Sequence, residues 1–327
     1  MSKPKVFVTR QIPQKGFDLI ADFCDVDLWD GDLPPSRDDF LRRARGVEGV
    51  LCLLTDLFDG DMMDAIGPQL KVISNFAVGC DNIDVLAATA RGVSVGNTPD
   101  VLTDVTADFA FALMMSAGRR IPEADCYARS GAWKTWQPMA LLGLEMKDAT
   151  LGLLGFGRVG KAMARRAAGF DMRVIYYDPL ETKSPSDVRA TRVEFETLLE
   201  ESDFLSLHTP LTDETRHMIA ADALSKMKPN AVLVNTSRGP VVDLEALYRA
   251  LKEKRIFAAG LDVTEPEPLP LNHPLFALDN IIVTPHIASS SKAARDKMAW
   301  IAAKNLIAGL KGERLPNCFN LPAPLKN

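Results

Sequence analysis

A glycine-rich turn constrains this chain of 327 residues more than any other feature. In the stretch LGLLGFGRVG, residues 151–160, Gly155, Gly157 and Gly160 follow an apolar strand pattern and precede a helical one. The first glycine permits a tight turn, the second lets the backbone approach a pyrophosphate, and the third allows close packing of helix on strand. Asp178 ends the next predicted strand about 20 residues later, where a ribose would bind. The sequence therefore predicts a dinucleotide-binding unit rather than an ordinary turn.

The choice between NAD and NADP depends on Asp178. Its carboxylate accepts hydrogen bonds from ribose hydroxyls and repels a 2′-phosphate, and the following residues PLETK contain no arginine. NAD is therefore the predicted cofactor, although Arg158 and Lys183 are cations close enough in sequence to approach a phosphate.

Apolar runs alternate with helix-period segments along the whole chain, which predicts parallel sheets covered by helices on both faces. We expect two doubly wound α/β domains: a substrate domain of residues 1–99 and 289–327, and a nucleotide-binding domain of residues 100–288 inserted in it. A cleft between the two is the expected ligand site. The strand candidates are residues 5–10, 26–30, 49–56, 71–79 and 93–97 in the first domain, and 150–156, 173–178, 204–208, 231–237, 257–263 and 281–285 in the second.

Two long helices are expected at the junctions of these domains. Residues 100–120 form an apolar helix candidate that suits a buried connector. A second candidate follows the serines at 289–291, and because six strands already complete the nucleotide domain, this helix is expected to return to the first domain. Its apolar positions recur at three- and four-residue steps: Met298, Ile301, Ala302, Leu306 and Leu310.

Composition narrows the possible partners and the compartment. The net charge of −5, with both signs mixed along the chain, offers no basic surface for nucleic acid or anionic lipid, and no apolar segment is long enough to span a membrane. The five cysteines are scattered without the short paired spacings of metal or redox sites. We therefore expect a cytoplasmic protein that binds no metal and acts on a small molecule.

Polar residues gather at predicted strand ends, which face the ligand crevice in an open α/β sheet. Arg238 follows one strand, Asp262, Glu265 and Glu267 follow the next, and His286 follows the last. A hydride acceptor that carries a carboxylate and a carbonyl needs a bidentate cation, a proton donor and a group that keeps this donor charged. Arg238, His286 and a carboxylate meet these needs, whereas an isolated arginine more often forms a surface salt bridge.

The other three histidines have simpler interpretations. His217 and His273 lie in turn-like segments and are expected to be structural, whereas His208 at a strand end either lines the nucleotide pocket or packs in the core.

Four ordered motifs, LLGFGRVG, NTSRGPVVD, GLDVTEPEPLPLNHP and TPHIASSS, make the chain resemble the D-isomer-specific 2-hydroxyacid dehydrogenases, most closely the glyoxylate/hydroxypyruvate reductases. The resemblance implies a flavodoxin-like substrate domain, a Rossmann NAD-binding domain inserted in it, and the reduction of short 2-oxo acids to D-2-hydroxy acids. It implies that Arg238 binds the substrate carboxyl and carbonyl, that His286 is the general acid, and that Glu267 rather than Glu265 is its partner. The backbone amides around Val78 and Gly79 match the family loop that holds the substrate carboxylate.

The resemblance also implies a homodimer in which Trp136, on an arm that also carries Trp133, enters the active site of the partner subunit. The residues expected to contact the cofactor, from the turn pattern and the resemblance together, are Thr106, Gly155, Phe156, Gly157, Arg158, Val159, Gly160, Asp178, His208, Pro210, Thr215, Thr236, Asp262 and His286.

Three related classes of protein leave alternatives open for the cofactor, the substrate and the function. Several glyoxylate reductases that use NADPH have serine or glycine where this chain has Asp178, so their cofactor does not transfer. Phosphite dehydrogenases are also similar, but they have a lysine where Val78 stands. The NAD-sensing corepressors related to C-terminal-binding protein share the same three catalytic residue types, so an interaction protein is the alternative from another class.

Overall fold

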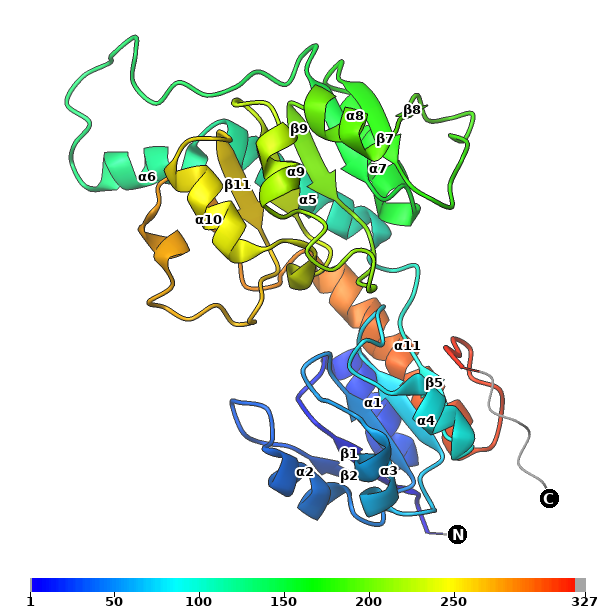
Figure 1. The fold of residues 1–327 in the computed structure, drawn as a ribbon. Coiled ribbons are helices and arrows are strands. Elements are labelled where there is room, and N and C mark those ends of the chain that lie inside the picture. Colours follow the sequence, from blue (N-terminus) through cyan, green and yellow to red (C-terminus); the bar gives the residue numbers. More distant parts are fainter. Residues whose placement is uncertain (1, 321–327) are drawn as a thin grey trace. The chain divides into compact units, whose positions relative to one another are not determined.

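The computed structural model describes residues 2–320, which form two compact units (Figure 1). The first unit comprises the residues up to Leu102 and those from Ser290 onward, and the second comprises Thr103–Ser289. The expected boundaries, after residues 99 and 288, lie close to these positions. Among the described residues, no helix is long and apolar enough to cross a membrane.

The first unit has a five-stranded parallel sheet in the order β2-β1-β3-β4-β5. This order is the flavodoxin-like arrangement that the resemblance implied. The central strands β3 and β4 are fully buried, because helices cover both faces of the sheet, whereas the edge strand β2 is partly polar and partly exposed. The elements are β1 (Lys5–Val8), α1 (Gln14–Phe23), β2 (Asp25–Leu28), α2 (Arg37–Ala44), β3 (Gly49–Cys52), α3 (Gly60–Ile66), β4 (Val72–Asn75), α4 (Val85–Ala90), β5 (Ser94–Gly96) and α11 (Lys292–Leu310).

Alternating residues of β1 divide the core of this unit. Phe7 packs with Phe40 and Phe58 on one face, whereas Val6 and Val8 pack on the other face against α1 and α11. All five expected apolar positions of α11 are buried, and four of them, Met298, Ala302, Leu306 and Leu310, belong to this second cluster. The helix after residue 291 thus lies in the first unit.

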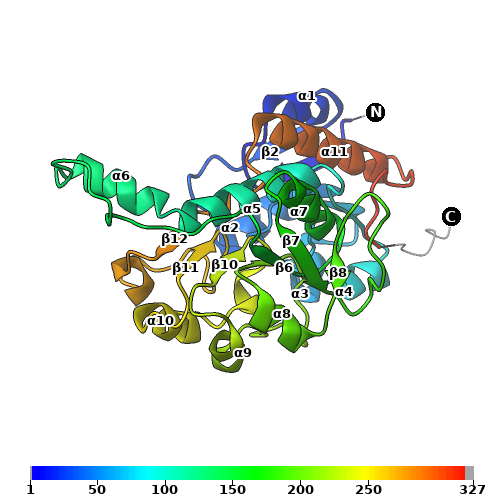
Figure 2. The same cartoon turned by 90° about the horizontal axis from the view of Figure 1, so that it is seen from above.

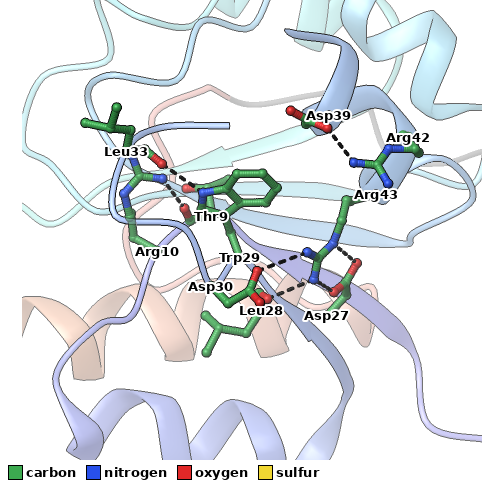
Figure 3. Close-up of polar contacts among 10 residues, drawn as sticks. All are labelled: Thr9, Arg10, Asp27, Leu28, Trp29, Asp30, Leu33, Asp39, Arg42 and Arg43. Carbon is green, nitrogen blue, oxygen red and sulfur yellow. Dashed lines mark hydrogen bonds and ion pairs between the residues drawn. The ribbon is translucent and has the colours of Figure 1, made fainter. Parts of the chain in front are cut away.

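The edge strand β2 is fastened by one arginine of α2. The Arg43 guanidinium lies 5.7 Å from the ring centre of Phe7 and 5.5 Å from that of Trp29. It donates to the Asp27 carboxylate and, at 2.8 Å, to the carbonyl of Leu28 (Figure 3). A cation placed over aromatic rings and also hydrogen-bonded to a carboxylate needs the planar fork of arginine. This contact joins α2 to the outermost strand.

The second unit has a seven-stranded parallel sheet in the order β12-β11-β10-β9-β6-β7-β8. The six expected strands are present, but the count of six was wrong, because the two-residue strand β8 pairs with the outer edge of β7. The elements are α5 (Thr103–Gly118), α6 (Ile121–Arg129), β6 (Thr150–Leu154), α7 (Arg158–Ala168), β7 (Arg173–Tyr177), β8 (Thr191–Arg192), α8 (Phe195–Glu201), β9 (Phe204–Leu207), α9 (Ala221–Lys226), β10 (Val232–Asn235), η1 (Gly239–Val241), α10 (Leu244–Lys252), β11 (Ala258–Leu261), η2 (Pro274–Ala277) and β12 (Ile281–Val283).

The helix expected at residues 100–120 is shorter than predicted. It starts at Thr103, after Asp100 with a φ of 66°, and ends at Gly118, before Arg120 with a φ of 55°. Rather than serving as a connector, α5 packs with α7 on one face of the second sheet, where Ala110, Phe111 and Met114 are buried.

An arm follows α5 and extends away from the sheet of its own unit (Figures 1 and 2). It consists of α6 and residues 130–145, and most of its side chains are exposed. Trp133 is 65% exposed and Trp136 is 80% exposed. The expectation that neither tryptophan belongs to the core is confirmed.

Candidate active site

The glycine-rich turn lies between β6 and α7. Gly155 has a φ of 93°, and a Cβ there would lie 2.7 Å from the backbone of His208. A Cβ at Gly160 would lie 2.3 Å from the carbonyl oxygen of Gly155, so both positions exclude a side chain. A Cβ at Gly157 would meet nothing within 4 Å. The turn therefore leaves open space beside the N-terminus of α7, where backbone N–H groups favour an anion.

Asp178 follows β7 and lies against this turn. Its Oδ2 accepts from the Phe156 amide at 2.7 Å, and its Oδ1 accepts from the amides of Leu180 and Glu181 at 2.8 and 3.0 Å. Burial raises the pKa of Asp178, but the three amide donors together with Lys161 lower it more, so the net shift is downward. Asp178 is therefore a carboxylate at neutral pH.

Neutral polar groups lie at the ends of β9 and β10. His208 Nε2 is 2.9 Å from Ser206 Oγ, and burial lowers the pKa of His208 to about 3, which keeps this ring neutral. Thr215 Oγ1 donates to the Pro210 carbonyl at 2.7 Å and so closes the loop after β9. Thr236 Oγ1 is buried and has no hydrogen-bond partner within the described residues. A bound ligand would satisfy such a group.

His286 and Glu267 lie within hydrogen-bond distance of each other. His286 Nδ1 lies 2.5 Å from Glu267 Oε1, and the two side chains are 29% and 36% exposed. Glu265 lies apart from this pair, because it contacts Arg216 Nη1 and His217 Nε2 at 3.0 Å each. Of the two glutamates considered from the sequence, Glu267 is the one beside His286.

Asp262 supports the His286 turn, which the sequence reasoning missed. Its Oδ1 accepts from Thr284 Oγ1 at 2.7 Å and from the Ile287 amide at 2.8 Å, and its Oδ2 accepts from the Ala288 amide at 2.7 Å. The His286 amide donates to the Asp262 carbonyl at 2.9 Å. Asp262 is 1% exposed, so these contacts satisfy a buried carboxylate.

Arg238 lies in the turn after β10, half-buried, and this turn packs on the one that follows β11. A Cβ at Gly239 would lie 2.0 Å from the Thr264 carbonyl oxygen, so only glycine permits this approach. Asn235 holds the Arg238 turn, because its Nδ2 donates to the Arg238 carbonyl at 2.8 Å and its Oδ1 accepts from the Ser237 amide at 2.9 Å. The structure thus joins the Arg238 turn to the segment that leads to Glu267.

The remaining predicted residues lie elsewhere. Thr106 lies on α5, in its first turn, and Val78 and Gly79 follow β4 in the first unit. His217 contacts Glu265, and His273 Nδ1 accepts from the Leu275 amide at the start of η2 at 3.3 Å. Among residues 2–320, no three His, Cys, Asp or Glu side chains are grouped so as to hold a metal.

A dinucleotide turn, a histidine–carboxylate pair and an arginine turn, all at strand ends of one doubly wound sheet, are features of nucleotide-dependent oxidoreductases. Residues 111–288 match the family model "D-isomer specific 2-hydroxyacid dehydrogenase, NAD binding domain". A glyoxylate reductase of Korarchaeum cryptofilum is 51% identical over 320 residues, which are 97% of this chain and 96% of that protein. The chain belongs to the D-isomer-specific 2-hydroxyacid dehydrogenases.

Two solved structures have a similar fold. The TT0316 protein of Thermus thermophilus is 44% identical, with a TM-score of 0.91 over 97% of this chain and 100% of that chain. An NADPH-dependent glyoxylate/hydroxypyruvate reductase of Sinorhizobium meliloti, in complex with citrate, is 31% identical, with a TM-score of 0.84 and 97% of each chain covered.

Proposed function

We propose that this protein is a reductase of glyoxylate and related short 2-oxo acids, hydroxypyruvate among them, that uses NADH. The observation that carries the proposal is the contact between His286 and Glu267, in a chain 51% identical to a glyoxylate reductase. It pairs a proton donor with a carboxylate at the ligand-binding edge of the sheet.

The residues present fit NAD. The open space at Gly157 suits a pyrophosphate, Thr236 Oγ1 offers an unused polar atom, and Asp178 is a carboxylate of the kind that grips a ribose. When bound, the reduced nicotinamide supplies the hydride. Besides these three, the residues we assign to the cofactor site are Thr106, Gly155, Phe156, Arg158, Val159, Gly160, His208, Pro210, Thr215, Asp262 and His286. For Asp262 the contacts described above support an indirect role through the His286 turn.

In this proposal, separate side chains bind the substrate and donate the proton. Arg238 binds the substrate carboxylate and the reacting carbonyl, together with the amides of the Val78–Gly79 loop. His286 donates a proton to the carbonyl oxygen as the alkoxide develops, and Glu267 stabilises the charged imidazolium and fixes its orientation through Nδ1. The products are the D-2-hydroxy acid and the oxidised cofactor.

The preference for NADH rests on the charge of Asp178. NADPH would place its 2′-phosphate near this carboxylate, and like charges repel each other in a partly buried site. A solved relative, the reductase of Sinorhizobium meliloti, is NADPH-dependent, so the proposed preference is argued from Asp178 of this chain and not carried over from relatives.

We also propose that the protein is a cytoplasmic homodimer. The exposed arm with Trp133 and Trp136 presents large apolar side chains, which are typical of interfaces. In the proposed dimer, Trp136 contributes to the substrate site of the partner subunit. The five cysteines all lie within the described residues and form no disulfide there, as a reducing compartment favours.

A steady-state matrix of glyoxylate, hydroxypyruvate and pyruvate against NADH and NADPH tests this proposal. We expect the highest kcat/KM with NADH and with glyoxylate or hydroxypyruvate. His286→Asn should keep NADH binding and lower kcat by about 10²-fold or more, as expected for loss of a general acid. A wild-type protein that binds NADH but oxidises it with none of the three acids would instead favour an NAD-sensing interaction protein.

A further inference from the structure

Two buried carboxamides hold the Val78–Gly79 loop of the first unit. Asn75 ends β4 and donates its Nδ2 to the Gly79 carbonyl at 2.9 Å, and Asn97 follows β5 and donates its Nδ2 to the Val78 carbonyl at 2.7 Å. Asn75 is fully buried and Asn97 is 8% exposed, whereas Val78 is 38% exposed. Two consecutive carbonyls are thus bound from inside the unit.

This arrangement fixes the direction of one backbone donor. In a planar trans peptide the carbonyl and the following N–H point in opposite directions. Because the Val78 carbonyl points at Asn97, the Gly79 N–H points away from that buried carboxamide. Within residues 2–320 this N–H donates no hydrogen bond, so it is available to an external acceptor.

Asn97 is itself held by contacts from distant parts of the chain. Its carbonyl accepts from Asn305 Nδ2 at 2.9 Å, and its amide donates to the Asn317 carbonyl at 3.2 Å. Asn305, fully buried on α11, closes the network by accepting from the Asn317 amide at 2.9 Å. The carboxamide of Asn97 therefore projects from a backbone that the network holds in one place.

We propose that Asn97 is a positioning residue for the substrate: it holds the Val78–Gly79 peptide so that the Gly79 N–H is presented to the substrate carboxylate. This inference rests on the proposed function, because it assumes that the loop binds an acid. An aspartate at this position would place an acceptor against the Val78 carbonyl and drive the peptide away. The asparagine side chain is uncharged, so it can be buried at low cost, and its Nδ2 donates to the Val78 carbonyl.

The chain offers a matched control on the same strand edge. Asn320 Nδ2 donates to the Val93 carbonyl at 3.0 Å, and its Oδ1 accepts from the Val95 amide at 2.7 Å. Asn320→Asp therefore breaks a comparable carboxamide contact at β5 without touching the loop. If the effect of Asn97→Asp came only from a destabilised β5, Asn320→Asp would change KM for glyoxylate to a similar extent.

The test compares wild type, Asn97→Asp and Asn320→Asp in thermal unfolding and in steady-state reduction of glyoxylate. We expect Asn97→Asp to raise KM for glyoxylate about tenfold or more, as for loss of a hydrogen bond to a charged group, with KM for NADH unchanged. Asn320→Asp should lower the melting temperature but leave both KM values near wild type. If Asn97→Asp does not fold, Asn97→Ala removes the same donor without adding charge.

A second measurement separates this proposal from the proposed function. Oxalate, a carboxylate probe that NADH does not reduce, is titrated into the NAD-loaded protein labelled with nitrogen-15 glycine, and the Gly79 amide resonance is followed by NMR. We expect a shift in wild type that is reduced in the Asn97 variant. If the wild type shows this shift but does not reduce glyoxylate, the proposed function is wrong and the role of Asn97 stands. Equal KM changes in both aspartate variants, or a Gly79 shift unaffected by the Asn97 substitution, overturn the role of Asn97.

Discussion

Replacing Glu267 by glutamine tests the His286 pair with a change of one charge and almost no change in size. The contact spans 2.5 Å and both side chains are about one third exposed, 29% for His286 and 36% for Glu267. A hydrogen bond to a charged group contributes about 1.5–3 kcal/mol and a neutral one about 0.5–1.5 kcal/mol. Because solvent screens the pair, we take about 1–2 kcal/mol as the loss for the imidazolium.

This loss converts to a fall in kcat of about 5- to 30-fold, since 1.4 kcal/mol corresponds to about tenfold in rate. The fall should be smaller than that of His286→Asn, because the proton donor itself remains. NADH binding should not change. The solvent deuterium isotope effect on kcat should increase, since proton transfer becomes a slower step.

Glu265→Gln is the matched control for this experiment. Glu265 also contacts a histidine ring nitrogen, His217 Nε2, at 3.0 Å, yet lies apart from His286. Its substitution should change kcat by less than about twofold, as is usual for an exposed ion pair. A Glu267→Gln enzyme with wild-type kcat, or an equal loss in Glu265→Gln, would show that the assignment of the carboxylate is wrong.

Three further variants test Asp178, His208 and the arm. Asp178→Asn keeps an acceptor oxygen for the loop amides but removes the charge, so the ratio of kcat/KM for NADH over NADPH should fall about tenfold; a wild type that already prefers NADPH contradicts this interpretation. His208 has a folded pKa of about 3, below its unfolded value of about 6.5, so the unfolded state binds more protons between these values and stability falls as pH falls. In the cofactor-free protein, His208→Gln should therefore reduce the pH slope of the unfolding free energy by up to about 1.4 kcal/mol per pH unit, measured by urea unfolding; an unchanged slope would show that His208 is protonated in the fold. Trp136→Ala should change the ranking of glyoxylate, hydroxypyruvate and pyruvate with KM for NADH intact, and light scattering should show a dimer; an active monomer or an unchanged ranking would refute the role of the arm.

The strands were predictable because most of them are buried on both faces. In β4 and β10 every residue is buried, so each strand starts with apolar residues, VI and VLV, and ends in asparagine. β8 lacks this signal, because Thr191 and Arg192 are both exposed and pair only with the edge of β7. A two-residue edge strand needs the neighbouring strand, not its own side chains, to exist.

The break between α5 and α6 was not predictable from periodicity. Arg120 has a left-handed φ of 55° and donates to the Glu123 carboxylate, with one bond of 2.7 Å, so a local ion pair accompanies an unfavourable backbone conformation. The helical pattern of residues 100–120 gives no sign of this turn, since arginine is an ordinary helix former.

The strand-end argument predicted Arg238, His286 and a carboxylate together, because parallel strands bring their carboxyl ends to one edge of the sheet, and the family resemblance selected Glu267 as that carboxylate. It did not find the side chains that build the turns. Asp262 was predicted at the cofactor, and nothing in the sequence indicated that its side chain also accepts from the amides of Ile287 and Ala288. Such contacts depend on which turns meet, and this is decided by packing rather than by position along the chain.

One pattern in the structure nevertheless shows how such residues are recognised. The last residue of β4 and of β10 is a buried asparagine, and each donates its Nδ2 to a carbonyl of the turn that follows: Asn75 to Gly79 and Asn235 to Arg238. A strand-terminal asparagine with a predicted functional residue three or four positions later is therefore a signal for a turn that the asparagine builds. The sequence contains it twice, in SNFAVG and in VNTSRG.

This pattern predicts the effect of Asn235→Asp. The substitution keeps the acceptor for the Ser237 amide but removes the 2.8 Å donation to the Arg238 carbonyl and buries a charge, at a cost of about 1–3 kcal/mol. We expect KM for glyoxylate to rise about tenfold, because the turn that carries the Arg238 guanidinium loses its anchor. Asn280→Asp is the control, since Asn280 Nδ2 donates to the carbonyls of Leu251 and Phe257 at 3.2 and 3.1 Å, at the opposite end of the strands. If both variants lose stability and only Asn235→Asp raises KM, the strand-terminal asparagine acts through the turn; if KM is unchanged in both, Arg238 does not depend on Asn235 for its position.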